Sequence, residues 1–381
     1  MTYSYSTNAV HGNFKEREAF GAVIQPVYNS TTYIQPELGK TQKYEYGRGS
    51  NPTRLALEQF LANLEGAETV YAFSSGMAAT TAALSLFKTG DKVLFNNNMY
   101  GGTFRYISRV FPNQGISYEI IDDFNTFNFD TVGDDVKAVF IETPSNPLLY
   151  VSDLKKASAA AHKKGLLVIV DNTFMTSFFQ KPLELGADIV VCSTTKYYGG
   201  HSDIIGGFTA TNSPDIANRL KVLQNTLGAV PSPDDCFLLQ RSIKTMPLRL
   251  QRQTYNTEQI IKFLSSQKAI EKLFYPTLIP EQRSIQEAQS SGSGAVFSLI
   301  LKDTYNPSVF VASLKLFDLA VSLGAVESLV CHPATMTHES FTSELRLRAG
   351  ITDNLIRFSV GIEDADDLIS DLSAALKEAG K

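Results

Sequence analysis

Short apolar runs alternate with helical segments through the middle of this 381-residue chain. The runs read TVYAF, KVLF, ISYEII, KAVFIE, LLVIVDN and DIVVCS, and segments with helical spacing, such as 76–87 and 153–164, lie between them. Strands that are apolar at successive positions are typical of a sheet covered on both faces, and strands joined through helices run parallel. The pattern therefore predicts an α/β fold with a mostly parallel, buried sheet.

Two other stretches of the chain lack this alternation. Residues 1–60 are rich in Tyr, Thr, Asn, Gly and Pro and show little apolar periodicity, which predicts an extended arm that leans on another surface. After a Ser/Gly loop at 290–294, a few strands and helices follow in a different order. We therefore predict an N-terminal arm over 1–60, a large α/β domain over 61–245 and a smaller C-terminal α+β domain over 246–381.

Composition excludes several classes of function. The net charge of −5 and the scattered basic residues argue against a nucleic-acid partner. The N-terminus has no apolar core of a secretory signal, and no apolar stretch is long enough for a membrane helix. The three cysteines and five histidines show no zinc or disulfide spacing, so we expect no metal site. These features predict a cytoplasmic protein that acts on a small molecule.

Charged residues follow two of the predicted strands at their carboxyl ends. Asp171 ends the run VIVD, and Lys196 follows VVCSTT, 25 residues later. Ligands of open α/β sheets bind at the carboxyl ends of strands, so we expect both residues to face one crevice. Taken singly, such an aspartate often caps a helix and such a lysine is usually solvated. Together they fit pyridoxal 5′-phosphate (PLP): burial would free the lysine amine for a Schiff base, and the acid would keep the pyridine nitrogen protonated.

The segment 73–77, Phe-Ser-Ser-Gly-Met, indicates where a phosphate would bind. It runs from a predicted strand into a helix of small residues, so the first amides of that helix are unpaired donors that face the crevice. Ser193 and Thr195 add hydroxyl groups from the strand that precedes Lys196. A plain turn with a helix cap is the commoner meaning of such a string, and only its agreement with the other strand ends favours an anion site.

Seven motifs occur in order over nearly the whole chain. They are YxRxxNPT at 46–53, FSSGMAA at 73–79, MYGGT at 99–103, ETPSNP at 142–147, DNTF at 171–174, STTKYYGGHSD at 193–203 and IRFSVGIE at 356–363. This combination resembles the cysteine and methionine metabolism family of PLP-dependent enzymes. The family includes cystathionine γ-synthase, cystathionine γ-lyase, cystathionine β-lyase and methionine γ-lyase. The resemblance implies fold type I and homotetramers built from closely joined dimers.

The resemblance also implies roles for single residues. Lys196 would bind the cofactor covalently, Asp171 would contact its ring nitrogen, and Tyr100 would stack on the ring and act as an acid or base. Tyr46 and Arg48 would reach the phosphate of a neighbouring subunit, so that two chains share each active site. Thr173 would also bind the cofactor, and Arg357, Ser322 and Asn146 would bind the substrate α-carboxylate. The phosphate of the cofactor would lie among Ser75, Gly76, Met77, Ser193 and Thr195.

Two positions bear on the substrate. Arg105 resembles the arginine that family members acting on cystathionine carry near its distal end, and a second cation beyond Arg357 suits a dicarboxylic substrate. Val321 stands where many γ-synthases and γ-lyases have a glutamate. We therefore expect a relaxed lyase that cleaves cystathionine, homocysteine or related thioethers by γ- or β-elimination. A γ-synthase, a methionine γ-lyase and, more remotely, a non-catalytic PLP-binding protein are the alternatives.

Overall fold

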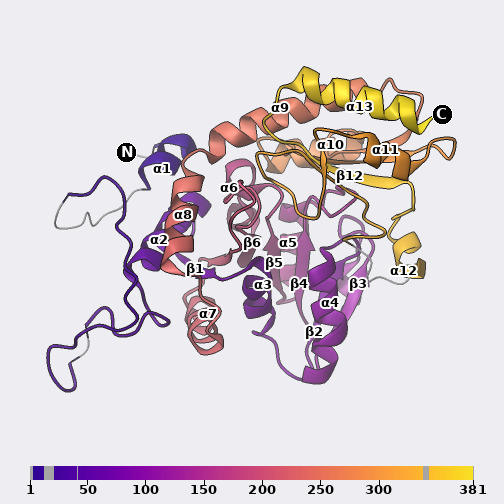
Figure 1. The fold of residues 1–381 in the computed structure, drawn as a ribbon. Coiled ribbons are helices and arrows are strands. Elements are labelled where there is room, and N and C mark those ends of the chain that lie inside the picture. Colours follow the sequence, from indigo (N-terminus) through magenta and orange to yellow (C-terminus); the bar gives the residue numbers. More distant parts are fainter. Residues whose placement is uncertain (1–2, 13–20, 41, 338–342, 381) are drawn as a thin grey trace.

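The computed structural model describes residues 3–12, 21–40, 42–337 and 343–380. These residues form a large part built on a seven-stranded sheet and a smaller part built on a five-stranded sheet, as Figure 1 shows. The long helix α9 (Met246–Leu264) lies along the top of the molecule in that view and leads from the first part into the second.

The larger sheet has the strand order β1-β7-β6-β5-β4-β2-β3. Its strands are β1 (Thr69–Phe73), β2 (Lys92–Asn96), β3 (Ser117–Ile121), β4 (Val136–Glu142), β5 (Leu167–Asp171), β6 (Ile189–Ser193) and β7 (Gly207–Thr211). Neighbouring strands are parallel except for β7, which is antiparallel to both β1 and β6. The predicted mostly parallel sheet is thus confirmed. The sequence pattern did not identify β7, whose run GFTAT follows a loop of turns and bends over 194–206 instead of a helix.

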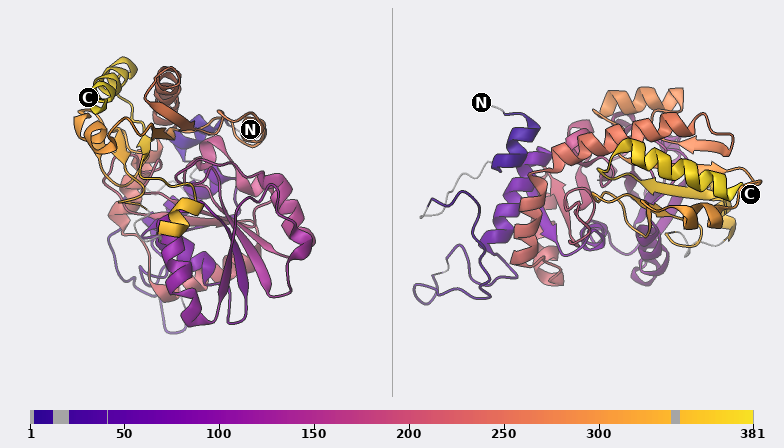
Figure 2. Two further views of the ribbon diagram at one scale, coloured as in Figure 1. Left: turned by 90° about the vertical axis from the view of Figure 1, so that its right-hand side faces the viewer. Right: turned by 45° about the horizontal axis from the view of Figure 1, so that its top comes forward.

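Helices cover both faces of this sheet, as the side view in Figure 2 shows. The helices of this part of the molecule are α2 (Pro52–Glu65), α3 (Gly76–Leu84), α4 (Gly101–Arg109), α5 (Leu154–Lys163), α6 (Thr176–Phe179), α7 (Pro214–Leu227) and α8 (Pro233–Ile243). Short 3-10 turns lie at Phe111–Gln114, Phe129–Thr131 and Pro182–Leu185. The predicted helix at 153–164 forms because the Asp153 carboxylate caps it, accepting from the Lys156 amide at 2.9 Å.

Alternate side chains of the inner strands enter two separate cores. Val168 and Val170 of β5 pack in one apolar cluster, and Ile169 between them packs in the other. A strand that is buried on both faces needs apolar residues at successive positions, which is the pattern of the sequence. None of the helices formed by the described residues is long and apolar enough to cross a membrane.

The N-terminal stretch is irregular over most of its described length and extends to the left of the body in Figure 1. Helix α1 (Tyr5–His11) is an exception that the sequence did not predict. It forms because Ala9 is fully buried and the ring of Tyr5 packs edge-on against Phe178, with centroids 5.3 Å apart. Residues 13–20 of the predicted arm lie outside the described residues.

The smaller sheet has the order β10-β11-β12-β9-β8 and is mixed, because only β10 and β11 are parallel. Its strands are β8 (Ile270–Phe274), β9 (Val296–Leu301), β10 (Asp318–Leu319), β11 (Leu329–Cys331) and β12 (Leu355–Ser359). The helices beyond α9 are α10 (Pro280–Gln289), α11 (Pro307–Ser313), α12 (Ser343–Arg348) and α13 (Ala365–Ala379). Strand β12 carries Arg357, which lines the cavity described below.

Candidate active site

A cavity of about 390 Å³ opens at the carboxyl ends of the central strands. The predicted site residues that line it are Ser75, Gly76, Met77, Tyr100, Arg105, Asn146, Asp171, Thr173, Ser193, Thr195, Lys196, Val321, Ser322 and Arg357. They come from the ends of β1, β4, β5 and β6, from the start of α4, from the loop at 321–323 and from β12. The fold therefore brings together segments that are almost 300 residues apart in the chain.

Lys196 lies in the turn after β6 and is half-buried. Its Nζ donates a hydrogen bond to the Ser322 hydroxyl at 2.8 Å. Burial lowers the pKa of Lys196 to about 8, and the positive charge of Arg357 contributes to this shift. Ser322 meets both charged residues because its backbone adopts φ 97°, a strained conformation that turns its hydroxyl to Lys196 and its carbonyl to Arg357.

The lowered pKa predicts how the apoprotein captures PLP. The ammonium form of Lys196 lacks the lone pair that attacks an aldehyde, so the capture rate should rise as the amine loses its proton. We expect the rate to reach half of its maximum near the pKa of about 8, well below the ordinary lysine value of 10.5. Stopped-flow absorbance of apoprotein mixed with PLP across a pH series measures this. A midpoint near 10.5 would contradict the perturbed amine.

Asp171 is the last residue of β5 and lies deep in the cavity. Its Oδ1 accepts a hydrogen bond from the Thr173 amide at 3.0 Å, and the Thr173 hydroxyl in turn accepts from the Ser193 amide at 2.9 Å. Burial raises the pKa of Asp171, while the bonds from Thr173 lower it. Within the described ranges no lysine or arginine forms an ion pair with Asp171, so a cationic group in the cavity would meet a carboxylate without a competing partner.

Helix α3 presents its N-terminus to the same cavity. Ser75 caps it, accepting from the Ala78 amide at 3.0 Å, and the amides at the start of the helix face the cavity as donors. Gly76 is required here because a Cβ on it would lie 2.6 Å from the Cβ of Ser193. The Thr195 hydroxyl is fixed nearby, donating to the Gly206 carbonyl at 3.2 Å. Such a cradle of amides and hydroxyls suits a phosphate.

Arg357 forms the opposite wall of the cavity. It lies in the middle of β12 and is 3% exposed. Its Nη1 donates to Asn146 Oδ1 at 2.8 Å and its Nη2 donates to the Ser322 carbonyl at 2.9 Å. Both of these hydrogen-bond partners are neutral, so neither competes with an incoming anion as a carboxylate would. A carboxylate in the cavity would meet a preoriented, desolvated fork.

Tyr100, Arg105 and Val321 lie at the mouth of the cavity and are exposed. The ring of Tyr100 can lie there because residue 102 is glycine: a Cβ at Gly102 would stand 2.4 Å from Tyr100 Cε1 and 2.9 Å from Met77 Sδ. Arg105 is one helical turn further along α4. The lack of a Cβ at Gly102 therefore allows the Tyr100 ring to lie over the cavity.

Tyr46 and Arg48 do not line this cavity within one chain. Arg48 Nη1 donates to the carbonyl of Asn225, at 2.5 Å, and its guanidinium lies 5.6 Å from the centre of the Tyr46 ring. Their predicted role toward a neighbouring subunit stays a prediction.

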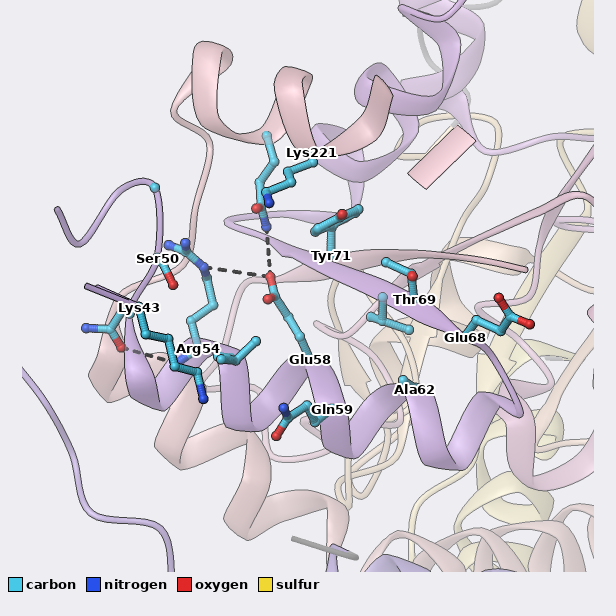
Figure 3. Close-up of a pocket in the computed structure, with 15 residues that line it drawn as sticks. Lys43, Ser50, Arg54, Glu58, Gln59, Ala62, Glu68, Thr69, Tyr71 and Lys221 are labelled. Atoms are coloured by element: carbon cyan, nitrogen blue, oxygen red, sulfur yellow. Dashed lines mark hydrogen bonds and ion pairs between the residues drawn. The ribbon is translucent and has the colours of Figure 1, made fainter. Parts of the chain in front are cut away.

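Arg54 holds the backbone of this part of the arm. Its Nη1 donates to the Gly47 carbonyl and its Nη2 to the Arg48 carbonyl, both at 3.0 Å. Arg54 Nε lies 3.7 Å from Oε1 of the buried Glu58, in a second cavity of about 370 Å³ that Figure 3 shows. Gln224 donates to the same Glu58 oxygen at 2.9 Å. The arm is thus anchored to α2 beside Tyr46 and Arg48.

Sequence reasoning gave no role to several residues that line the main cavity. They are Thr80, Gly102, Glu142, Phe174, Ile205, Leu323, Met336 and Thr337. The sequence does indicate Glu142, because it ends the apolar run of β4 as Asp171 ends that of β5. The two residues are register partners in the sheet. Residues such as Met336 stand in no motif, and only the fold brings them to the cavity.

The donor set of the cavity fits PLP on its chemistry. Around one space lie an amine with a lowered pKa, a carboxylate that has no cationic partner among the described residues, and a cradle of amides and hydroxyls in which a Cβ at Gly76 would clash with Ser193. The fold and this set of groups define a class, the PLP-dependent enzymes with an α/β fold of type I.

Comparison with known proteins identifies the family within that class. A family model described as Cys/Met metabolism PLP-dependent enzyme matches residues 6–377, and the chain belongs to this family. It is 45% identical to a cystathionine beta-lyase of Lactococcus lactis subsp. cremoris (strain MG1363), over 98% of this chain and 99% of that protein. It is also 45% identical to a cystathionine gamma-lyase of Bacillus subtilis (strain 168), over 97% of this chain and 98% of that protein.

Solved structures agree with this assignment. A cystathionine gamma-lyase from Lactobacillus plantarum, crystallised with L-serine, matches with a TM-score of 0.96 and 40% identity over 99% of each chain. A cystathionine gamma synthase from Xanthomonas oryzae pv. oryzae in complex with cystathionine matches with a TM-score of 0.96 and 37% identity, over 100% of this chain and 99% of that chain. The protein is therefore a PLP-dependent enzyme that acts on amino acids and is related to the cystathionine lyases.

Proposed function

We propose that this enzyme is a carbon–sulfur lyase of the cystathionine γ-lyase type, which cleaves cystathionine and related thioethers to a keto acid, ammonia and a thiol. The observation that carries this proposal is a pair of arginines along one cavity, with Arg357 in its wall and Arg105 at its mouth. Cystathionine has a carboxylate at each end, so two cations can hold it lengthwise. The 45% identity to relatives named as lyases supports the same reaction class.

The residues around the cavity divide the chemistry between them. Arg357, held by Asn146 and Ser322, would bind the α-carboxylate and present the Cα–H bond to Lys196. The amine of Lys196, with a pKa of about 8, would take the Cα proton as a general base. When bound, PLP supplies an electron sink for the pair left on Cα, and Asp171 would hold a proton at the ring nitrogen so that the ring can accept these electrons.

Departure of sulfur needs a further proton. Tyr100 at the cavity mouth is placed to give a proton to the leaving thiolate. β-Elimination needs only the Cα proton to be removed, whereas γ-elimination also needs a proton to leave Cβ. Lys196, whose Nζ donates to the neutral hydroxyl of Ser322 at 2.8 Å, would make that second transfer after it has passed the Cα proton on to bound PLP, which would leave its amine free to act as a base again.

The direct test is to incubate the purified holoenzyme with cystathionine and to identify the keto acid. Cleavage on the γ side releases 2-oxobutyrate and cysteine, and cleavage on the β side releases pyruvate and homocysteine. We expect 2-oxobutyrate as the main product without any added thiol. Release of neither keto acid would overturn the proposal.

A γ-replacement transferase is the second candidate, because the synthase structure from Xanthomonas oryzae matches the chain with the same TM-score, 0.96, as the lyase structure. Such an enzyme would join cysteine to an activated homoserine ester with the same residues. Product analysis with the ester, in the presence and absence of cysteine, separates the two reactions. A lyase releases keto acid in both conditions, and a transferase forms cystathionine only when cysteine is present.

Arg105→Ala is expected to reduce kcat/KM for cystathionine by about 10-fold to 100-fold, because it removes a charge-assisted contact to the distal carboxylate. Methionine has no distal carboxylate, so its kcat/KM should fall less than about threefold. The comparison needs steady-state kinetics with both substrates on both proteins. Arg109→Ala, one turn further along α4 and outside the cavity, is the matched control. Equal losses for the two substrates would remove the argument for a distal carboxylate site.

We also propose that the enzyme is a homotetramer of closely joined dimers in which Tyr46 and Arg48 complete the phosphate site of the partner. Mixing Arg48→Ala with Lys196→Ala subunits tests this idea. If one site uses Lys196 from one chain and Arg48 from the other, a mixed dimer contains one intact site. We expect it to recover up to about half of the wild-type activity. No recovery in dimers verified as mixed would count against shared sites.

A further inference from the structure

Glu142 lines the cavity at the end of β4 and has no role in the reaction as proposed above. Its side chain is 4% exposed and lies beside Asp171, its register partner on β5. Burial and the negative charge of Asp171 raise the pKa of Glu142 well above its usual value. Burying a second acidic side chain beside Asp171 costs free energy of folding, and the hydrogen bonds of Glu142 must offset that cost.

The Glu142 carboxyl accepts hydrogen bonds from two backbone amides of the site. Its Oε2 accepts from the Tyr100 amide at 2.7 Å, and a hydrogen bond from the Asn146 amide lowers the pKa of the same carboxyl. Tyr100 is the N-cap residue of α4, and its own side chain makes no capping bond with any of the described residues. A carboxyl on a neighbouring strand therefore fixes the start of that helix.

The backbone of Glu142 is itself fixed by Asn96 at the end of β2. Asn96 Oδ1 accepts from the Glu142 amide at 2.8 Å, and Asn96 Nδ2 donates to the Glu142 carbonyl at 3.3 Å. Nδ2 also donates to the Asn98 carbonyl at 2.6 Å, two residues before Tyr100. Asn96 therefore holds the backbone that carries the Glu142 carboxyl, and it links the end of β4 to the loop before α4.

The two amides belong to residues with different tasks. Tyr100 carries the ring at the cavity mouth, whose place Gly102 permits. Asn146 carries the side chain that accepts from Arg357 Nη1 at 2.8 Å. We propose that Glu142 is a positioning residue whose carboxyl sets the Tyr100 ring and the Asn146–Arg357 pair in one fixed geometry. This inference rests on the roles proposed above for Tyr100 and Arg357, and it is independent of which carbon–sulfur bond the enzyme cleaves.

Glu142→Gln tests the inference with little change in volume. A carboxyl offers two acceptor oxygens and can carry a negative charge, whereas a carboxamide offers one oxygen and is neutral, so the contacts to the two backbone amides should weaken. Asp371→Asn is the matched control, because the buried Asp371 carboxyl on α13 also accepts from two backbone amides, those of Lys315 and Leu316. Asp371 lies outside the cavity.

Two readouts on the holoenzyme separate positioning from a loss of stability. Visible circular dichroism of the bound PLP reports the placement of the ring against Tyr100. Spectral titration with glycine and with methylamine compares two amines that differ by a carboxylate. For Glu142→Gln we expect an altered dichroism band and a ratio of methylamine to glycine dissociation constants that falls by about tenfold, as the loss of one hydrogen bond would give. Asp371→Asn should match the wild type in both.

Wild-type values of both readouts in Glu142→Gln, or equal changes in Asp371→Asn, would overturn the inference. If Glu142→Gln does not fold, Asn96→Ser is the second variant, because it weakens the hydrogen bonds to the Glu142 backbone and leaves the carboxyl in place. It should shift both readouts in the same direction by a smaller amount. An unchanged Asn96→Ser holoenzyme would then overturn it. Neither readout uses a thioether, so failure of the proposed lyase activity and failure of this inference are distinguishable.

Discussion

Lys196→Ala is expected to lower turnover by about ten-thousandfold or more, because the same amine would bind the cofactor and move the protons of the reaction. The protein should still fold, since Lys196 is half-buried and its Nζ makes one hydrogen bond among the described residues, to Ser322. The absorbance band of PLP bound through Lys196 should also be lost. Borohydride reduction followed by peptide mass spectrometry should locate the cofactor on Lys196 in the wild type only.

Two controls make this result specific. Lys92→Ala removes a lysine at the amino end of β2, where Nζ pairs with Asp135 at 2.9 Å, and should leave turnover unchanged. Added methylamine should restore part of the lost activity of Lys196→Ala by supplying an amine to the vacated position. A Lys196→Ala enzyme with a wild-type spectrum and wild-type turnover would refute the assignment of the lysine.

Asp171→Asn is expected to lower turnover by about 100-fold to 1,000-fold, in the range found when one preorganised electrostatic contact to a reacting group is removed. A neutral carboxamide does not stabilise the positive charge of a protonated pyridine nitrogen as a carboxylate does. The ring would then accept electrons from Cα less readily, so kcat should fall more than the affinity for the amino acid. Steady-state kinetics together with spectral titration by glycine separate these two quantities.

The matched control for this variant is Asp188→Asn. Asp188 lies just before β6, and its Oδ2 accepts from the Val168 amide at 2.7 Å, so it is also an aspartate that binds backbone of the sheet. It lies outside the cavity, and its asparagine variant should keep wild-type kcat. An Asp171→Asn enzyme with unchanged kcat would show that this carboxylate does not act on the ring nitrogen.

Local pattern explains how much of the site could be predicted from the sequence. Asp171 and Lys196 each follow an apolar run, and parallel strands bring their carboxyl ends to one edge, so their meeting was predictable without coordinates. Segment 73–77 was readable for the same reason. Strand β7 was not predicted, because its short run GFTAT follows a loop of turns and nothing in these five residues indicates that they pair with β1 and β6.

The remaining geometry depends on contacts between distant segments. The bond between Arg357 and Asn146 joins residues 211 positions apart, and nothing in either local sequence specifies it. Glu142 could be placed at a strand end, but its bond to the Tyr100 amide depends on how α4 begins beside β4. Helix α1 likewise forms against side chains of α6.

The sequence by itself determined the class of fold, the cofactor and the strand ends at which an amine and a carboxylate would meet, because burial of a parallel sheet imposes a periodicity that adjacent residues carry. Only the tertiary structure decided the lowered pKa of Lys196, the neutral partners of Arg357 and the place of Glu142. Those properties come from desolvation and from hydrogen bonds between residues that are far apart in the sequence. They therefore exist only in the folded chain.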